Sequence, residues 1–328
     1  MREISYSEAI REAMCQAMRR DQRVYLMGED VGTFGGVWGI SQGMLQEFGE
    51  QRIRDTAISE AAIIGSALGS AMTGMRPIAE IMFGDFLMCA GDQLVNQVAK
   101  ARFMSGGKAN IPLTIRITSG APGSAAAQHS QSGESWFMNI PGLKIATPAS
   151  PADAKGLLVS AMRGEDPVLF FEHKMLYALK GPVPEDEDFC IPFGQAAIVR
   201  EGKDVTVIAI GIMVQKALEA ARILEKEGIK VEIIDPRTLV PLDKETIIQS
   251  VAKTGQVVIA HEAHKRAGPG AEIAAMLAEE AVEYLDGPVV RVAARNVPLP
   301  YSPELENYVL PGTQDLVDAI HSLKIRQS

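Results

Sequence analysis

The sequence is poor in aromatic residues and cysteines and has no excess of positive charge. Its 328 residues are 5% aromatic, 47% apolar and 22% charged, which is the composition of an ordinary globular protein. A fibrous or largely disordered chain is therefore excluded. At roughly 150 residues per domain, the length predicts about two domains, each with its own core.

The charge balance argues against two classes of partner. The chain has 32 lysine and arginine residues against 41 aspartate and glutamate residues, a formal charge of −9. A surface of this sign repels phosphate backbones and anionic lipid. Nucleic acid and membrane surfaces are not expected as partners.

The sequence also gives no reason to expect a cysteine framework, a leader peptide or a membrane span. Cys15, Cys89 and Cys190 are odd in number and widely spaced, which disfavours disulfides and a zinc cluster. The first residues alternate charged with apolar side chains, unlike a signal peptide. Residues 61–75 are apolar but shorter than the ~20 residues of a membrane span, so they predict a buried helix. We expect a cytoplasmic protein.

Several familiar catalytic motifs are absent. No phosphate-binding G-x-x-x-x-G-K-[ST] occurs, and residues 208–217 offer one glycine where a dinucleotide fold needs three. No G-x-S-x-G supports serine hydrolysis. His261, Glu262 and His264 lack the spacing of a zinc protease, so we expect them to be polar loop residues.

The pattern that is present is an alternation of strands and helices, typical of an α/β fold with mostly parallel sheets. In the first series, strands are predicted at residues 24–31, 111–120 and 167–173. Helices are predicted from residue 60 and at residues 153–162. A second series comprises strands 205–211, 231–235, 256–260 and 288–293, with helices after 211 and at 271–284. Thr313 is predicted to cap a last helix.

A segment rich in proline and acid separates the two series. We therefore expect two doubly wound domains at residues 1–180 and 195–328, joined by a linker at 181–194.

Three segments contain candidate catalytic or ligand-binding residues, and the first of them contains Glu60. Ser59 is a predicted helix cap, Glu60 lies just inside the helix, and Gly65, Gly69 and Gly74 would allow close approach of another backbone. Glu60 either complements the helix dipole or points to a ligand at the edge of the sheet. The residues alone leave both interpretations open.

The other two segments contain aromatic residues and a histidine. Phe83, Asp85 and Phe86 lie at a predicted strand-to-helix junction, where the rings either fill the core or stack on a heteroaromatic ring. His129 lies in a small-residue loop at 119–132 after a strong strand. Because loops on a rigid sheet often carry catalytic groups, this histidine is a candidate for proton transfer.

Taken together, long blocks of the chain resemble the beta subunits of the thiamine-diphosphate-dependent first component of 2-oxo acid dehydrogenase complexes. This family includes pyruvate, branched-chain 2-oxo acid and acetoin dehydrogenases. The blocks are GEDVG (28–32), ISEAAIIGSALG (58–69), AEIMFGDF (79–86), QHSQS (128–132), PGLKIATPASPADAKGLL (141–158), DPVLFFEHK (166–174) and DPRTLVPLD (235–243).

The resemblance implies a fold and roles for four residues. It implies an N-terminal pyrimidine-binding domain and a C-terminal transketolase-like domain. Glu60 matches the acid that hydrogen-bonds the aminopyrimidine of thiamine diphosphate, and Phe86 matches the aromatic residue under that ring. His129 matches a histidine associated with proton handling and acylation of the lipoyl group, and Glu29 matches an acid lining the channel between two active sites.

The resemblance also implies metals and partners. A structural potassium ion would be held by main-chain oxygens at Leu113, Ala161, Met162, Gly164 and Asp166, although Gly164 replaces an acid found in some members. The GDG motif that binds Mg²⁺ is absent from this chain. The family supplies it on an alpha subunit in an α₂β₂ tetramer, and the second domain would dock the lipoyl-bearing acyltransferase.

Two other functions remain as alternatives. One is a transketolase-like or deoxyxylulose-phosphate-synthase-like subunit, which would need basic residues that the SAAAQHSQS loop lacks. The other is a noncatalytic scaffold. Among substrates, the small residues of this loop favour pyruvate or acetoin over branched chains, and pyruvate and acetoin are about equally favoured.

Overall fold

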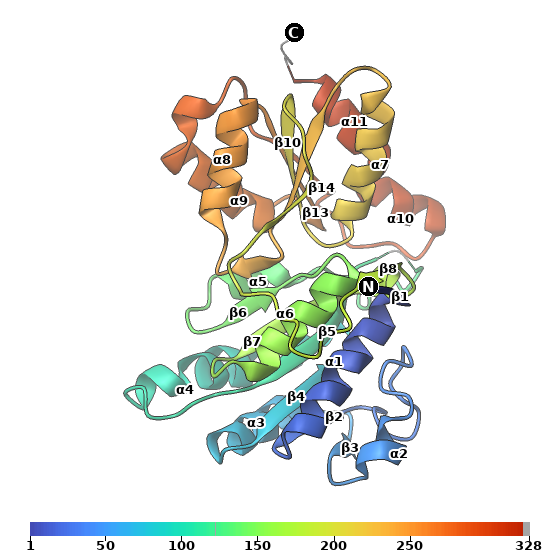
Figure 1. Ribbon diagram of the computed structural model, residues 1–328, viewed down its shortest axis with the longest axis vertical. Helices are drawn as coiled ribbons and strands as arrows, with labels where there is room; N and C mark the ends of the chain where they lie inside the picture. The colour runs from blue at the N-terminus through green and yellow to red at the C-terminus, as the bar shows by residue number, and fades with distance from the viewer. Residues whose placement is uncertain (122, 324–328) are drawn as a thin grey trace. The chain divides into compact units, whose positions relative to one another are not determined.

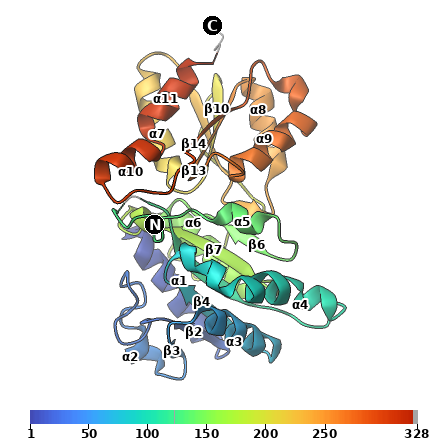
Figure 2. The same cartoon turned by 180° about the vertical axis from the view of Figure 1, so that it is seen from behind.

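The computed structural model describes residues 1–121 and 123–323, which form two compact units (Figures 1 and 2). The first unit contains Met1–Ser119 and Trp136–Phe193. The second contains Gly120–Ser135 and the chain from Gly194 onward. The segment with His129 thus belongs to the second unit, although it lies within the predicted first domain.

The first unit is built on a parallel sheet, as the alternating pattern predicted. Its strands lie in the order β6-β7-β5-β4-β2-β3. Every residue of four of these strands is buried, which is typical of a parallel sheet covered by helices on both faces. The strands are β2 (Val24–Gly28), β3 (Ile53–Asp55), β4 (Arg76–Ile81), β5 (Thr114–Ser119), β6 (Lys144–Ala146) and β7 (Val168–His173).

Helices cover both faces of this sheet. On one face, α1 (Tyr6–Arg20) packs against α6 (Pro151–Arg163), and on the other lie α3 (Glu60–Met72) and α4 (Ala99–Met104) (Figures 1 and 2). The predicted helix from Glu60 is α3, and its cap is confirmed because the Ser59 side chain accepts a hydrogen bond from the Ala62 amide. Shorter elements are α2 (Met44–Phe48), η1 (Gly84–Ala90), η2 (Gln93–Val98), α5 (Glu134–Met138) and η3 (Lys174–Leu176).

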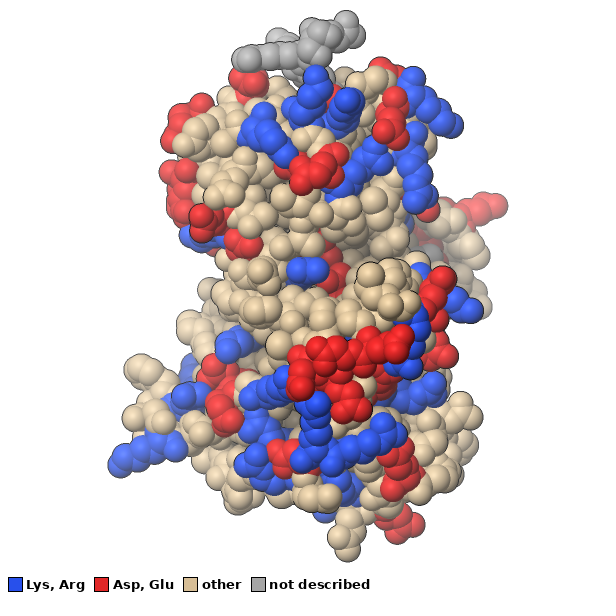
Figure 3. Space-filling view, viewed as in Figure 1, with Lys and Arg blue, Asp and Glu red and all other residues tan. Residues whose placement is uncertain are grey.

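The beginning of the predicted linker is a strand. Residues Lys180–Val183 form β8, which pairs antiparallel with β1 (Arg2–Ser5). The acidic residues that follow form ion pairs within the first unit: Asp188 contacts both Arg20 and Arg163. Figure 3 shows acidic and basic side chains next to one another over this unit.

The second unit has a five-stranded sheet in the order β14-β13-β10-β11-β9. All neighbours are parallel except β9, an antiparallel edge strand that the sequence did not predict. Helices α8 and α9 cover one face, and α7 and α11 cover the other (Figures 1 and 2). The elements are β9 (Ala197–Arg200), β10 (Val205–Ala209), α7 (Met213–Glu225), β11 (Val231–Asp235), β12 (Thr238–Val240), α8 (Lys244–Thr254), β13 (Val257–His264), α9 (Pro269–Glu280), η4 (Val282–Tyr284), β14 (Val290–Ala294), α10 (Pro303–Val309) and α11 (Thr313–His321).

Three local predictions were wrong. Gly312, not Thr313, caps α11: its amide donates to Asp315 Oδ2 at 2.7 Å, while the Thr313 hydroxyl donates to Glu219. His261 and Glu262 are not loop residues but lie in β13 and are buried, because the strand continues beyond residue 260.

The third prediction, close approach of another backbone at the glycines of the α3 segment, fails for contacts within the described chain. A Cβ at Gly65 would make only ordinary contact with Gln93, and one at Gly69 or Gly74 would meet nothing within 4 Å. No backbone of the described chain therefore approaches closely there.

Candidate active site

The predicted site residues of the first unit lie at the carboxyl ends of its parallel strands. Glu29 directly follows β2, Phe86 lies in η1 after β4, and Glu60 begins α3 after β3. In open α/β sheets this edge is where ligands bind.

Two carboxylates come together at this edge. Glu60 is the first residue of α3, and only 9% of it is exposed. Burial raises the pKa of Glu29, and the negative charge of Glu60 raises it further. The two acids are thus close enough to interact, and Glu29 holds its proton to higher pH than an ordinary glutamate does.

The first unit also contains a row of aromatic rings. The ring centroids of Phe86 and Phe83 are 5.8 Å apart, those of Phe83 and Trp38 6.2 Å, and those of Trp38 and Tyr177 5.7 Å. Rings in such a row offer flat faces to a heteroaromatic ligand. Sequence reasoning found Phe83 and Phe86 but missed Trp38, which lies in the glycine-rich segment that follows Glu29.

The loop after Glu29 is fixed by side chains at the ends of other strands. Asp55, the last residue of β3, accepts hydrogen bonds from the Gly32 amide at 2.6 Å and the Thr33 amide at 3.2 Å. Gly36 has a φ of +78°, and a Cβ there would lie 3.2 Å from a Glu80 carboxylate oxygen. Because both the left-handed backbone and the close carboxylate disfavour a side chain, only glycine suits this position.

Beneath the site, an arginine bridges three neighbouring strands. Arg116 on β5 donates to both oxygens of Glu172 on β7, at 2.7 and 2.8 Å, and to Glu80 on β4. Tyr177 donates to Glu172 at 3.0 Å and contacts the Thr118 hydroxyl. Burial works to lower the pKa of Arg116, but the charges of Glu172 and Glu80 raise it above its ordinary value. Sequence reasoning missed this Arg116 cluster.

His129 is partly exposed on the loop of the second unit. The next helix begins with Glu134, which is fully buried. Burial raises the pKa of Glu134 to about 7, and the neighbouring charge of Glu262 adds to the effect. The loop of His129 is thus followed along the chain by a buried carboxyl group that titrates near neutral pH.

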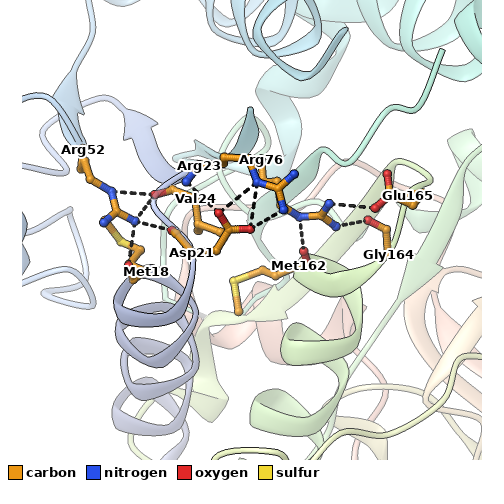
Figure 4. A network of polar contacts seen from close by, with 9 residues as sticks. All are labelled: Met18, Asp21, Arg23, Val24, Arg52, Arg76, Met162, Gly164 and Glu165. Atoms are coloured by element: carbon orange, nitrogen blue, oxygen red, sulfur yellow. Dashed lines mark hydrogen bonds and ion pairs between the residues drawn. The ribbon is translucent and has the colours of Figure 1, made fainter. Parts of the chain in front are cut away.

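The residues matched to a potassium site lie at the opposite edge of the first sheet, around the end of α6 (Figure 4). The main-chain oxygens of Met162 and Gly164 accept hydrogen bonds from the Arg76 guanidinium. Leu113 and Ala161 oxygens accept from the Val168 and Gly164 amides. A positive group thus already contacts two of the five predicted oxygens, so the described residues do not fit a potassium ion well.

The remaining predicted ligand, Asp166, forms surface ion pairs. Its carboxylate contacts Arg102 at 2.7 Å and Lys144 at 2.9 Å. The potassium site stays a prediction, and no part of the function below depends on it.

Among the described residues, no group of three or more histidine, cysteine, aspartate or glutamate side chains could hold a metal ion.

Across residues 1–121 and 123–323, none of the helices has both the length and the apolar character needed to cross a membrane.

Comparison with known families accounts for nearly the whole chain. Residues 2–180 match the transketolase pyrimidine-binding domain, and residues 194–316 match the transketolase C-terminal domain. A solved structure described as a split-gene transketolase in an inactive β₄ tetramer superposes with a TM-score of 0.79, at 26% identity over 97% of both chains. These findings confirm the predicted two-domain α/β fold.

Full-length relatives are beta subunits. The chain is 49% identical to the beta subunit of acetoin:2,6-dichlorophenolindophenol oxidoreductase of Bacillus subtilis, over 96% of both chains. It is 46% identical to the 2-oxoisovalerate dehydrogenase beta subunit of the same organism, over 98% of both chains. It is 44% identical to the pyruvate dehydrogenase E1 beta subunit of Rhizobium meliloti, over 98% of this chain and 70% of the relative. The chain therefore belongs to the transketolase-like family of beta subunits of pyruvate, acetoin and 2-oxoisovalerate dehydrogenases.

Proposed function

We propose that this chain is the beta subunit of a cytoplasmic α₂β₂ dehydrogenase that uses thiamine diphosphate. With its alpha partner it cleaves the carbon–carbon bond next to the carbonyl of pyruvate or acetoin and passes the acyl group to the lipoyl arm of an acyltransferase. The observation that carries the proposal is the Glu29–Glu60 pair at the sheet edge of a domain matching the pyrimidine-binding family.

The donor set suits an aminopyrimidine. Thiamine diphosphate, when bound, stabilises the carbanion left by bond cleavage. The buried Glu60 carboxylate can accept a hydrogen bond from a protonated ring nitrogen and thereby hold a proton at that atom. Phe86 offers an aromatic face to the ring, and Glu29 can hold a proton to higher pH than an ordinary glutamate because burial raises its pKa. His129 would handle a proton at the reacting substrate.

Exposed apolar residues on the site's own segments support a partner chain. Ile58, two residues before Glu60, is 84% exposed, and Phe34, on the loop after Glu29, is 75% exposed. Met88, two residues after Phe86, is also exposed. Large apolar side chains around a polar site are typical of protein–protein interfaces. The alpha subunit would cover them and supply the Mg²⁺ ligands for the cofactor's diphosphate, since this sequence has no GDG motif.

The second unit is proposed to assemble the complex and dock the acyltransferase. Its match to the transketolase C-terminal domain supports the assembly role. The net charge of −9 suits a basic segment of the acyltransferase.

Substrate choice rests on the loop around His129. Small residues at Ser124, Ala125, Ala126 and Ala127 favour a small substrate. Parallel assays with pyruvate, acetoin and 2-oxoisovalerate should therefore give the lowest kcat/KM for 2-oxoisovalerate.

The decisive test is Glu60→Gln in the reconstituted tetramer. We expect turnover to fall by about 10²–10⁴-fold, because the isosteric amide cannot hold the proton at the ring nitrogen. Tetramer mass and thermal midpoint should stay unchanged. The matched control is Glu50→Gln, an exposed glutamate of the same unit, which should keep full activity.

Two outcomes would contradict the proposal. Near-normal turnover of Glu60→Gln would remove the acid–base role. If the wild-type chain does not raise the thiamine diphosphate affinity of the alpha subunit in calorimetry, the chain is a scaffold. Ketol transfer between sugar phosphates would instead identify a transketolase-like subunit.

A further inference from the structure

We propose that Glu262 and Glu306 are positioning residues for His129. Their buried carboxylates bind the main chain of the loop at 120–132 and hold His129 where it meets the substrate. The inference rests on the proposed function, which gives His129 its role. The two glutamates touch neither substrate nor cofactor in this proposal and act through the loop alone.

Glu262 holds the loop at both ends. It lies on β13 and is only 7% exposed. Its Oε1 accepts a hydrogen bond from the Ala121 amide at 2.7 Å and one from the Ser132 hydroxyl at 3.4 Å. Ala121 precedes His129 and Ser132 follows it, so one carboxylate closes the loop. The Gly120 amide, which donates to the Gln131 oxygen at 3.3 Å, reinforces this closure.

Glu306 holds the loop at its amino-terminal half. It lies on α10 and is 2% exposed. Its Oε2 accepts hydrogen bonds from two successive amides, those of Gly123 and Ser124, both at 3.2 Å. Because one carboxylate oxygen binds two successive amides, this contact fixes the backbone direction here.

The loop has a conformation that needs such support. Ser124 has a φ of 51° and Ala126 a φ of 59°, the left-handed region that residues with a Cβ rarely adopt. Strained backbone of this kind persists only where the surroundings hold it, and it concentrates at functional sites. Ser124 is one of the residues bound by Glu306, and His129 lies three residues after Ala126.

An apolar contact anchors the start of the loop independently of the two carboxylates. Ala121 is buried in a cluster with Leu299, Val309 and Leu310. Removing one carboxylate should therefore loosen the loop without detaching it from the second unit. This separation makes the proposal testable, because the fold can survive a change that misplaces His129.

The experiment is a double-mutant cycle in the reconstituted α₂β₂ enzyme. The variants are Glu306→Ala, Glu262→Ala, His129→Ala, and each glutamate variant combined with His129→Ala. Each glutamate variant should lower kcat by about 10–100-fold, the loss expected from a misplaced catalytic group. Thiamine diphosphate affinity should change by less than about twofold. In the His129→Ala background, adding either glutamate variant should cause no further loss, because the effect passes through His129.

Conservative and surface variants complete the test. Glu306→Gln keeps an acceptor oxygen and should restore most of the lost kcat. Glu304→Ala, on the same helix but exposed, should match the wild type. Thermal midpoints show whether each variant is folded.

The outcomes separate the two proposals. If His129→Ala is fully active, the role of His129 in the proposed function is wrong and the positioning role falls with it. If His129→Ala is inactive but Glu306→Ala and Glu262→Ala are normal, only the positioning role is overturned. Losses that add to that of His129→Ala, or that Glu306→Gln does not rescue, would show a general structural role and would also overturn it.

Discussion

Both units of the chain bury acidic side chains, but they balance the charge in different ways. In the first unit, Glu80 and Glu172 share the guanidinium of Arg116, which is 1% exposed. In the second, the influences on Glu134 are burial, a main-chain hydrogen bond and the charge of Glu262, and none of them is a cation. In the first arrangement a cation opposes the rise in pKa that burial causes at Glu172, whereas the second leaves a carboxyl group free to change its charge near neutral pH.

The difference teaches that burial alone does not decide whether an acid stays charged. Burial raises the pKa of a carboxyl group by removing it from water, and a cation and hydrogen bonds oppose that rise, as Arg116 and Tyr177 do at Glu172. The Arg116 cluster therefore suits a rigid support beneath the Glu29–Glu60 site. The Glu134–Glu262 pair suits a region that responds to protons beside the loop of His129.

The largest effect is expected from Arg116→Met. The variant leaves two buried carboxylates without their cation, which typically costs about 3–5 kcal/mol. Urea unfolding should show the loss directly. The control is Arg102→Met, whose partner Asp166 lies at the surface and whose loss should cost less than about 1 kcal/mol. Equal costs for the two variants would contradict the supporting role of the cluster.

The second effect is a pH-dependent stabilisation by Glu134→Gln. The pKa of Glu134 rises from an ordinary 4.5 to about 7 on folding, so the folded state binds the proton more tightly than the unfolded state. Wild-type stability should fall as pH rises from 4.5 through 7, by on the order of 3 kcal/mol. The glutamine variant should not lose this stability as the pH rises, because its side chain does not titrate.

The measurement for Glu134→Gln is urea unfolding at several pH values. The variant should match the wild type near pH 4.5 and exceed it at pH 8. A difference that stays constant across this range would show that Glu134 does not titrate as its burial requires.

A smaller effect is expected from Tyr177→Phe. Its hydroxyl donates to Glu172 at 3.0 Å, and removing one hydrogen bond to a charged group should cost about 2 kcal/mol while leaving the Arg116 pair in place. Thermal unfolding measures the loss. Tyr284→Phe, at a largely exposed position, should stay within about 0.5 kcal/mol of the wild type. If Tyr177→Phe is as stable as the wild type, the hydrogen bonds from Arg116 alone are sufficient for the Glu172 carboxylate.

The smallest effect is expected on the pKa of Glu134 when Glu262, the neighbouring acid in the second unit, is replaced. Glu262→Gln removes a negative charge beside Glu134, so the pKa of Glu134 should fall towards its ordinary value without reaching it, since burial is the larger cause. A titration of Glu134 followed by NMR should show the lower midpoint. An unchanged midpoint would mean that burial alone sets this pKa.

Local sequence patterns predicted much of the fold, because apolar runs and helix caps act over a few residues. Strands β2, β5, β7 and β10 and the Ser59 cap were predicted for this reason. The pairing of β8 with β1 was not, because it joins residues far apart in the sequence. Likewise, nothing local indicates that residues 120–135 pack with the second unit.

In the candidate site, too, residues with a local sequence signal could be predicted and residues linked by distant contacts could not. Glu29, Glu60, Phe86 and His129 could be found from their blocks of sequence, whereas Arg116 and its partners could not, since their contacts cross three strands. A signal did exist: each of β4, β5 and β7 carries charged residues inside an otherwise apolar run, namely Glu80, Arg116 and Glu172. Charges in adjacent buried strands predict a compensated cluster.

The second unit is made of two stretches that are separate in the sequence, and this has a consequence for synthesis on the ribosome. The loop with His129 emerges early, but Glu262 follows Ala121 by 141 residues and Glu306 follows Gly123 by 183. Since translation adds roughly 5–20 residues per second, the nascent chain spends roughly 7–37 seconds without these contacts to the loop. His129 thus acquires its final surroundings only when the segment that carries Glu306 has been made.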